Sequence, residues 1–283
     1  MTRQEQLELK KIACRVRMGV LTSTHAAKAG HPGGSLSAAE ALTYLYFKEM
    51  RLDPADPKWD GRDRFVLSKG HAAPALYAAL ALRGYFPVED LATLRHTDSY
   101  LQGHPSMNLV PGVDMSTGSL GQGVSAACGM ALGAKYKGQD LRVYTLLGDG
   151  ELQEGEVWEA AMFAAHYKLD DLCLLADLNG LQIDGPVARV MDPAPVDEKF
   201  RAFGFFVQVI DGHSFEALEA AFAAARAEKG RPSAILLKTT KGKGVSYMEN
   251  QVGWHGKAPG DAEYEQGMAE LTAALKELEG ETV

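Results

Sequence analysis

The stretch Val143-Tyr144-Thr145-Leu146-Leu147-Gly148-Asp149-Gly150 decides the fold, because an apolar run ends in a glycine turn that carries a carboxylate. The apolar and β-branched residues predict a short buried strand, and Gly148 lets the chain turn sharply after it. Small and apolar residues with helical spacing follow over 154–167, and a second apolar run at 172–176 predicts another buried strand. This order predicts two parallel strands whose carboxyl ends lie at the same edge of a sheet.

Oxygen-bearing side chains follow both of these strands. Asp149 comes directly after the first, and Asn179 comes shortly after the second. Carboxylate, amide and carbonyl oxygens are suitable ligands for Mg²⁺ or Ca²⁺, and open α/β sheets bind ligands at the carboxyl ends of their strands. The helix start expected over 151–159 adds free N–H groups that favour a phosphate. Gly-Asp-Gly alone is common in turns, but in this context it predicts a site for a metal diphosphate.

The remaining sequence alternates helix-like and strand-like segments without internal repeats. This pattern predicts one α/β domain over residues 1–283, with a mostly parallel sheet covered by helices on both faces. A chain of 283 residues, 46% of them hydrophobic, can bury a core of that size. The acidic segment 260–283 is expected to be a solvent-facing helix. Further strands are expected at 65–67, 205–210 and 234–238, and further helices at 4–27, 38–50, 74–83, 120–136 and 215–229.

Composition excludes several classes of function. A formal net charge of -8 argues against a nucleic-acid-binding surface. No apolar run is long enough to span a membrane, and the first twenty residues are interrupted by charges, so a cytoplasmic location is expected. Cys14, Cys128 and Cys173 lie far apart among apolar residues, which predicts reduced core cysteines and no metal site.

Several motifs, taken together, resemble those of transketolases. The segment from Gly148 to Gly155, with Asp177-Leu178-Asn179 after it, is similar to the thiamine diphosphate motif of that family. The resemblance covers about residues 10–260 and implies a thiamine diphosphate-binding fold, with thiamine diphosphate and Mg²⁺ (or Ca²⁺) as cofactors. Other segments match in the family's order: His31-Pro32-Gly33, Arg64 to His71, Gly103-His104-Pro105, Thr117 to Gly123 and Trp254-His255-Gly256.

The resemblance also implies roles for individual residues. Asp149, Asn179 and the carbonyl group of Leu181 are expected to bind the metal. His31, His104 and His255 are expected to face the sugar and to act in catalysis, since a pKa of about 6.5 suits proton exchange near neutrality. The residues expected to contact the cofactor are His71, Lys69, Gly118, Ser119, Leu120, Asp149, Gly150, Glu154, Asn179, Ile183, Lys241 and His255.

Some of these residues have an ordinary structural explanation as well. Glu154 and Glu159 match glutamates that link two active sites at a transketolase subunit interface, and they are counted with the catalytic residues on that basis, but first-turn acids also stabilise a helix. Lys241 is equally well explained as a solvated lysine. His213 is expected at the surface, in a turn before a helix capped by Ser214. The remaining histidines, His25, His96 and His166, are expected to be structural.

The reaction implied is the transfer of a two-carbon ketol unit from a ketose phosphate to an aldose phosphate, as in the pentose phosphate pathway. The residues after Asn179 are too few for the family's pyrimidine-binding domain, which carries the cofactor-activating glutamate. We therefore expect the pyrimidine-binding and C-terminal domains on a partner chain, in an α2β2 assembly that acts on sugar phosphates. Such a chain would be the N-terminal subunit of a split transketolase.

Two alternatives remain open from sequence. One is a related enzyme of the same cofactor class, for a specialised sugar or for 1-deoxyxylulose 5-phosphate synthesis; Glu151-Leu152-Gln153-Glu154-Gly155 and Trp254-His255-Gly256 favour transketolase over the latter. The other is a cofactor-binding regulatory module without enzymatic activity. A module of that kind would be expected to have lost metal or histidine residues, and the sequence retains them.

Overall fold

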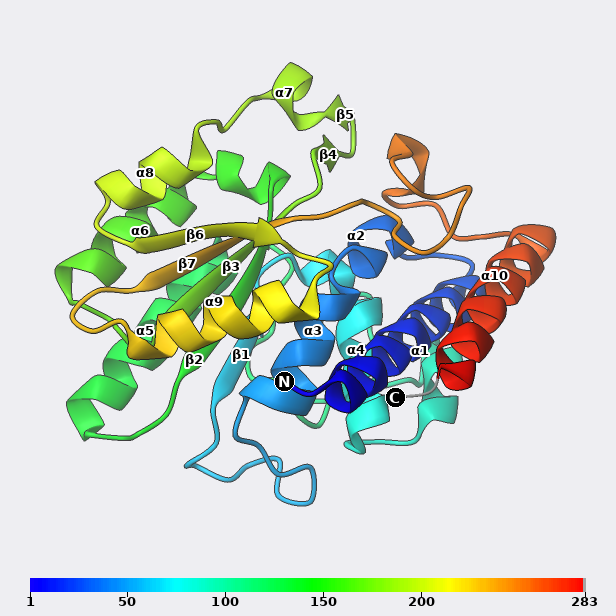
Figure 1. Ribbon diagram of the computed structural model, residues 1–283, viewed down its shortest axis with the longest axis horizontal. Helices are drawn as coiled ribbons and strands as arrows, with labels where there is room; N and C mark the ends of the chain where they lie inside the picture. The colour runs from blue at the N-terminus through cyan, green and yellow to red at the C-terminus, as the bar shows by residue number, and fades with distance from the viewer. Residues whose placement is uncertain (282–283) are drawn as a thin grey trace.

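The computed structural model describes residues 1–281 and contains a five-stranded parallel sheet with helices on both sides (Figure 1). The strand order is β1-β2-β3-β7-β6, and each neighbouring pair is parallel. This arrangement confirms the fold class predicted from sequence. The strands are β1 (Arg64–Leu67), β2 (Val143–Gly148), β3 (Leu172–Leu178), β6 (Phe206–Asp211) and β7 (Ser233–Lys238).

Two groups of helices cover the sheet. One face is covered by α1 (Arg3–Ala27), α3 (Ala39–Tyr44), α4 (Ala73–Arg83) and α9 (Phe215–Ala227), and the other by α5 (Gln122–Lys137), α6 (Gly155–His166) and α8 (Val196–Ala202). Successive side chains of β2 enter different cores: Tyr144 and Leu146 pack under the first group, and Val143 and Leu147 under the second. Burial on both faces explains why β2 is an unbroken apolar run.

The helices begin and end where local chemistry requires. The Thr2 hydroxyl accepts a hydrogen bond from the Glu5 N–H (3.1 Å) at the start of α1, and Ser214 caps α9 by accepting from the Ala217 N–H (3.2 Å). The expected cap of Ser214 on this helix is therefore confirmed. At the C-terminal end of α5, Gly138 adopts a φ of 63°, a left-handed conformation that favours glycine.

The segments that follow β1, β2, β3 and β7 meet at one edge of the sheet, because all of these strands run in the same direction. After β2 comes a 3₁₀ turn, η4 (Gly150–Gln153), and after β1 comes η2 (Gly70–Ala72). After β3 the chain forms a small hairpin of β4 (Leu181–Gln182) and β5 (Gly185–Pro186), followed by α7 (Val187–Val190). The hairpin and α7 extend beyond this edge of the sheet (Figure 1).

Three local expectations are corrected by the structure. The helix expected over 38–50 is divided into α3 and a π-helical turn, η1 (Leu45–Glu49), and the segment before it, for which no helix was expected, contains the short helix α2 (Pro32–Leu36). The acidic C-terminal segment forms α10 (Asp261–Gly280), as expected, but it packs along α1 (Figure 1). Gly267 permits this contact, because a Cβ there would lie 2.8 Å from the Leu21 side chain. Residues 282–283 of the expected helix lie outside the described part.

The structure also bears on the expectations of buried, reduced cysteines and of no membrane-spanning segment. Cys14, Cys128 and Cys173 are all buried and unbonded to one another. Burial raises the pKa of the Cys128 and Cys173 thiols to about 12, so neither thiol is ionised near neutral pH. None of the helices within residues 1–281 has the length and hydropathy needed to cross a membrane.

Candidate active site

A cavity of about 340 Å³ lies at the carboxyl edge of the sheet, between the segments that follow β1, β2, β3 and β7. Most of the residues predicted for the site meet there, whereas His104, Ser119 and Glu159 are outside its lining. The predicted residues that line this cavity, which we call the carboxyl-edge cavity, are His31, Lys69, His71, Gly118, Leu120, Asp149, Gly150, Glu154, Asn179, Leu181, Ile183, Lys241 and His255.

Asp149 is held by backbone donors at the end of β2. Its Oδ1 accepts a hydrogen bond from the Gly150 N–H (2.9 Å), and its Oδ2 accepts one from the Gly180 N–H (2.5 Å). Burial, with a smaller contribution from the nearby Asp177, raises the pKa of Asp149 to about 6. A carboxylate whose ionised form is disfavoured in this way gains from a bound cation, so the environment suits a metal ligand.

Asn179 is oriented by a buried carboxylate. Its side-chain amide donates to Asp177 (3.2 Å), and its Oδ1 accepts from the Leu181 N–H (3.2 Å). Asp177 also accepts hydrogen bonds from the Ser37 hydroxyl (2.6 Å), from Thr239 and from Lys69. Although burial favours the neutral acid, the Lys69 ammonium and the two hydroxyls hold the pKa of Asp177 below its ordinary value.

Lys69 is more constrained than a flexible phosphate-binding lysine would be. It is 1% exposed, and its ammonium bonds to Asp177 and to the Gly34 carbonyl (2.8 Å). Because an ammonium has three donors, one N–H remains for a ligand in the cavity. Its predicted contact with the cofactor therefore stays a prediction, and its structural role at Asp177 is a finding.

Glu151 was not singled out from the sequence, yet it fixes the loop that carries Asp149. Its carboxylate accepts hydrogen bonds from the Ser68 hydroxyl (2.5 Å) and from the N–H groups of Gly121 (2.9 Å) and Gly148 (3.0 Å). Burial raises the pKa of Glu151 despite these donors. The only signal in the sequence was its place within the Gly148–Gly155 motif, which any first-turn acid would share.

Three histidines form a cluster in the carboxyl-edge cavity. The ring centroids of His31, His71 and His255 lie 5.2–5.5 Å apart. Burial, with help from neighbouring positive charges, lowers the pKa of His31 to about 4 and that of His255 to about 3, and it lowers the pKa of His71 strongly. All three rings are therefore neutral at pH 7. The Nδ1 atom of His31 is buried without a hydrogen-bond partner in the described chain.

Lys241 is buried, so its interpretation as a solvated lysine is wrong. Its side chain is 1% exposed, and its ammonium donates to the Leu181 carbonyl (3.1 Å) and to Nδ1 of His255 (2.8 Å). Because an ammonium only donates, Nδ1 of His255 accepts and the proton of the neutral ring lies on Nε2. Burial lowers the pKa of Lys241 to about 8, which leaves it mostly charged at pH 7.

His104 lies outside the lining of the cavity and next to one of its walls. A Cβ on Gly118 would lie 3.2 Å from the His104 ring, so the glycine allows the ring to approach the backbone there. Arg95, which no sequence motif indicated, lies over the adjoining backbone: a Cβ on Gly103 would be 2.6 Å from its guanidinium carbon. After burial, Arg95 is the next cause of the lowered pKa of both His31 and His104.

The predicted glutamates and apolar contacts lie at or beyond the rim. Glu154 is exposed at the edge of the cavity, and Glu159 is exposed on α6. The expected helix start over 151–159 is corrected, because α6 begins at Gly155 and a 3₁₀ turn precedes it. Ile183 is 63% exposed beside the cavity, whereas Leu120 forms part of the wall.

The prediction that His213 is a surface residue is wrong. The turn before α9 is present, but the ring is half-buried and is hydrogen-bonded on both nitrogens. Its Nδ1 lies 2.9 Å from the buried Glu40 carboxylate, and its Nε2 accepts from the Thr240 N–H (2.9 Å). The sequence missed this role because Glu40 and Thr240 are distant in the chain.

These residues fit a metal diphosphate. Within residues 1–281, no three His, Cys, Asp or Glu side chains converge as metal ligands, which leaves a mixed oxygen set of Asp149, Asn179 and a carbonyl as the candidate. Such a set suits a hard cation whose remaining ligands are phosphate oxygens or water. The buried ammonium of Lys241 can bind the anion. The unpartnered Nδ1 of His31 can form a hydrogen bond with a polar group of the ligand.

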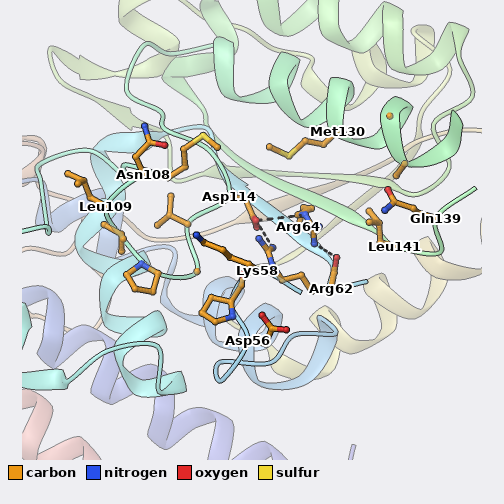
Figure 2. A pocket seen from close by; sticks show the side chains of 18 of the residues that line it. Asp56, Lys58, Arg62, Arg64, Asn108, Leu109, Asp114, Met130, Gln139 and Leu141 are labelled. Atoms are coloured by element: carbon orange, nitrogen blue, oxygen red, sulfur yellow. Dashed lines mark hydrogen bonds and ion pairs between the residues drawn. The ribbon is translucent and has the colours of Figure 1, made fainter. Parts of the chain in front are cut away.

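A second, larger cavity lies away from this site (Figure 2). It measures about 750 Å³, and Arg64 and Leu141 place it near the starts of β1 and β2, at the amino edge of the sheet. Asp114 lies between Arg62 and Arg64 in this amino-edge cavity, as the dashed lines in Figure 2 indicate. The buried carboxylate of this cavity is therefore paired with two arginines.

Comparisons with known proteins identify the family. The family described as "Transketolase, thiamine diphosphate binding domain" matches residues 9–275. The chain is 46% identical over 268 residues to the 6-deoxy-6-sulfo-D-fructose transketolase subunit SqwG of Clostridium sp. (strain MSTE9), covering 95% of this chain and 98% of that subunit. It is 42% identical over 277 residues to an apulose-4-phosphate transketolase subunit of Phocaeicola vulgatus, covering 98% of each.

Full-length transketolases match over part of their length. The transketolase of Leishmania mexicana superposes with a TM-score of 0.84 at 31% identity, covering 96% of this chain and 46% of that one. Human transketolase is 46% identical over 259 residues, which cover 90% of this chain and 40% of the human protein. The chain therefore belongs to the transketolase family of transferases and corresponds to its N-terminal, thiamine diphosphate-binding part.

Proposed function

We propose that this chain is the diphosphate-binding subunit of a thiamine diphosphate-dependent transketolase, which transfers a two-carbon ketol unit between a ketose phosphate and an aldose phosphate. The observation that supports this most directly is the carboxyl-edge cavity, where a backbone-held Asp149, the buried ammonium of Lys241 and three neutral histidines face one another. Thiamine diphosphate, when bound, supplies the carbon nucleophile and the electron sink of the reaction.

The chain's own residues would bind and orient the diphosphate. Asp149 and Asn179 would hold Mg²⁺ through oxygen atoms, with the Leu181 carbonyl as a third ligand. Lys241 would donate to a phosphate oxygen from a buried position, where a charge-assisted hydrogen bond is strong. The Gly150 and Gly180 N–H groups already fix the Asp149 carboxylate, so this ligand needs little rearrangement.

The histidines would handle protons on the sugar. His31, His71 and His255 are neutral at pH 7, so His31 and His71 each keep one nitrogen that can accept a proton or a hydrogen bond, whereas His255 can only donate to the sugar from Nε2. His255 is fixed with its proton on Nε2, since Lys241 donates to its Nδ1. His104, beside Gly118, would act at the outer end of the substrate. Glu154 and Glu159 would act at the contact between two sites.

We also propose that a second polypeptide completes the site. Two relatives that match along nearly their whole length carry the word subunit in their names. An apolar surface on α5 and α6, made of Tyr136, Met162, Phe163 and Tyr167, is 37–76% exposed and is suited to an obligate contact. Within this surface the Phe163 and Tyr167 rings are in contact (centroids 4.5 Å apart), and Lys135 of α5 donates to the Tyr167 carbonyl (3.1 Å) at the end of α6. We propose an α2β2 assembly with a pyrimidine-binding subunit.

A specialised sugar is the second candidate for the substrate. The names of the relatives refer to 6-deoxy-6-sulfo-D-fructose and to apulose 4-phosphate, so the pentose phosphate pathway is one option among several. The reacting ketol end is common to these donors, whereas the distal end differs. The donor should therefore be identified by a screen of ketoses that share the ketol end and differ only in the distal group.

The function is tested by assaying this chain alone, the pyrimidine-binding partner alone and their mixture. Xylulose 5-phosphate, fructose 6-phosphate and 6-deoxy-6-sulfo-D-fructose serve as donors, with ribose 5-phosphate as acceptor, while light scattering follows the mass. We expect ketol transfer from the mixture and none from either chain. Failure of every donor with a mixture that assembles and binds thiamine diphosphate would refute the proposed activity.

A further inference from the structure

We propose that Arg17, Glu40 and His213 form a buried relay that positions Lys241 and, through it, His255. These three residues do not line the carboxyl-edge cavity, and nothing in the sequence motifs assigned them a part in it. The inference rests on the proposed function, because Lys241 matters only if the cavity binds a phosphate. His213 is thus a positioning residue, with no contact to the substrate.

The centre of the relay is the Glu40 carboxylate on α3, which is 6% exposed. Arg17 from α1 donates to both of its oxygens (2.6 and 2.7 Å), and His213 from the turn before α9 donates from Nδ1 (2.9 Å). Although burial favours the neutral acid, the Arg17 guanidinium and His213 hold the pKa of Glu40 below its ordinary value. The carboxylate therefore joins three separate elements.

Two arms run from this centre to the segment that carries Lys241. The first arm is His213, whose Nε2 accepts from the Thr240 N–H (2.9 Å) on the residue before Lys241. The second arm is Arg17, whose Nε donates to the Lys243 carbonyl (2.8 Å) two residues after it. Lys241 is thus held on both sides along the chain. Its own carbonyl accepts from the Asn250 N–H (2.9 Å).

The relay fixes one tautomer of His213. A backbone N–H can only donate, so Nε2 must accept and the single proton of the neutral ring must lie on Nδ1, facing Glu40. The Asp211 carboxylate in the same turn accepts from the His213 N–H (2.9 Å) and sets the position of the ring's backbone. A side chain without an acceptor at the Nε2 position would leave the Thr240 N–H unpaired in a partly buried place.

The position of Lys241 has little tolerance. A Cβ on Gly33 would lie 3.1 Å from Cε of Lys241, and the Gly242 N–H donates to the Gly33 carbonyl (3.0 Å). A shift of the segment would therefore move the ammonium away from Nδ1 of His255, which it reaches at 2.8 Å. The relay thus links α1, α3 and the turn before α9 to Lys241, and Lys241 keeps the proton of His255 on Nε2.

The test compares His213→Phe with His213→Gln. Phenylalanine keeps the ring volume and loses both hydrogen bonds, whereas glutamine can donate its amide to Glu40 and accept from the Thr240 N–H. Hydrogen exchange of residues 239–244 is measured on the chain without cofactor, and calorimetry measures the binding of thiamine diphosphate with Mg²⁺. His25→Phe, which removes a histidine in the last turn of α1 that is bonded to Asp261 of α10, is the matched control.

We expect His213→Phe to speed exchange over 239–244 and to weaken binding about tenfold or more, as loss of an indirect supporting contact does. His213→Gln should restore most of both effects, and His25→Phe should change neither. A folded His213→Phe protein with wild-type exchange and wild-type affinity would overturn the relay. So would a His213→Gln protein with the defects of His213→Phe. Absence of binding by the wild-type chain assembled with its pyrimidine-binding partner would instead count against the proposed function.

Discussion

The two cavities differ in how their charged and polar groups are satisfied. In the larger, amino-edge cavity, Arg62 donates to the Pro57 carbonyl (2.7 Å) and pairs with Asp114, and Asp114 also accepts from the Phe65 N–H (2.8 Å). In the smaller, carboxyl-edge cavity, Asp149 has a raised pKa and His31 has an unpartnered buried nitrogen. Volume alone would select the amino-edge cavity, in which the buried carboxylate is already paired.

This difference has a physical origin. Polar groups that stabilise a fold are paired within it, since burying them unpaired costs about 1–3 kcal/mol each. Groups that await a ligand are left incompletely paired, and the rest of the protein compensates for that cost. The comparison therefore predicts that equivalent substitutions in the two cavities have opposite consequences: a loss of binding in one, and a loss of stability or no effect in the other.

The largest effect is expected for the metal ligand. Asp149→Ala should reduce the affinity for thiamine diphosphate with Mg²⁺ by about a hundredfold or more, because no neighbouring oxygen replaces the carboxylate. The carboxylate of Asp56, in the amino-edge cavity, offers a matched control, and Asp56→Ala should bind like the wild type. Titration calorimetry of both variants checks this. Equal affinities for Asp149→Ala and wild type would refute the metal site.

Lysines in the two cavities provide the next comparison. Lys241→Met should weaken binding of the diphosphate about tenfold to a hundredfold, the usual worth of a charge-assisted hydrogen bond in a buried place. Lys58→Met, an exposed lysine that lines the amino-edge cavity, should leave the affinity unchanged. Inorganic pyrophosphate as a competitor separates binding of the diphosphate from binding of the ring. Equal losses in both variants would contradict the distinction between the cavities.

The sequence predicted the positions of Asp149 and Asn179 in the carboxyl-edge cavity because these positions depend on local structure. A buried strand, a glycine turn and a helix place Asp149 at a sheet edge whatever the rest of the chain does, and the motif brought Asn179 to the neighbouring strand. The hydrogen bonds that hold these side chains and loops in place were not predictable in the same way. Glu151 binds Ser68, and Lys69 binds Asp177, across 83 and 108 positions of the chain. Pairings of that kind depend on tertiary packing, which periodicity does not encode.

The same reasoning explains the error at His213 and the alternative that the sequence left open at Lys241. The residues flanking His213 are typical of turns and therefore indicated exposure, whereas the sequence left Lys241 equally open to a solvated position and to a contact with the cofactor. Packing of α3 against the turn brings Glu40 to His213, and packing of α2 against the loop after β7 buries Lys241. A turn residue can thus be buried when a turn is itself covered by other elements.

The dependence of binding on pH is a smaller effect that only the carboxyl-edge cavity should show. The folded pKa of Asp149, about 6, lies above its ordinary value of 3.8. The folded chain without metal therefore holds more protons than the unfolded chain between these values, and Asp149 costs stability as pH rises through that window. Metal binding requires the ionised form, so affinity should fall about tenfold per pH unit below 6.

Calorimetry with thiamine diphosphate and Mg²⁺ from pH 7 to pH 4.5, in buffers of differing ionisation enthalpy, measures this effect together with the number of protons released. At pH 5 the wild type should release close to one proton more than at pH 7, and the Asp56→Ala control should behave identically. An affinity independent of pH over this range would mean that Asp149 does not exchange a proton for a metal ion.

The smallest effect on binding is expected from a substitution that strongly disturbs the amino-edge cavity. Arg62→Ala removes the partner of the buried Asp114 and leaves Arg64, whose Nε lies 4.0 Å from that carboxylate, as the nearest cation. Leaving a buried charge without its partner should lower the free energy of unfolding by about 3 kcal/mol, measured by urea titration. Because this cluster lies at the opposite edge of the sheet from Asp149, the affinity for thiamine diphosphate should stay within about twofold of the wild type. A stable Arg62→Ala protein that has lost cofactor binding would instead show that the larger cavity belongs to the functional site, and the contrast between the two cavities would fail.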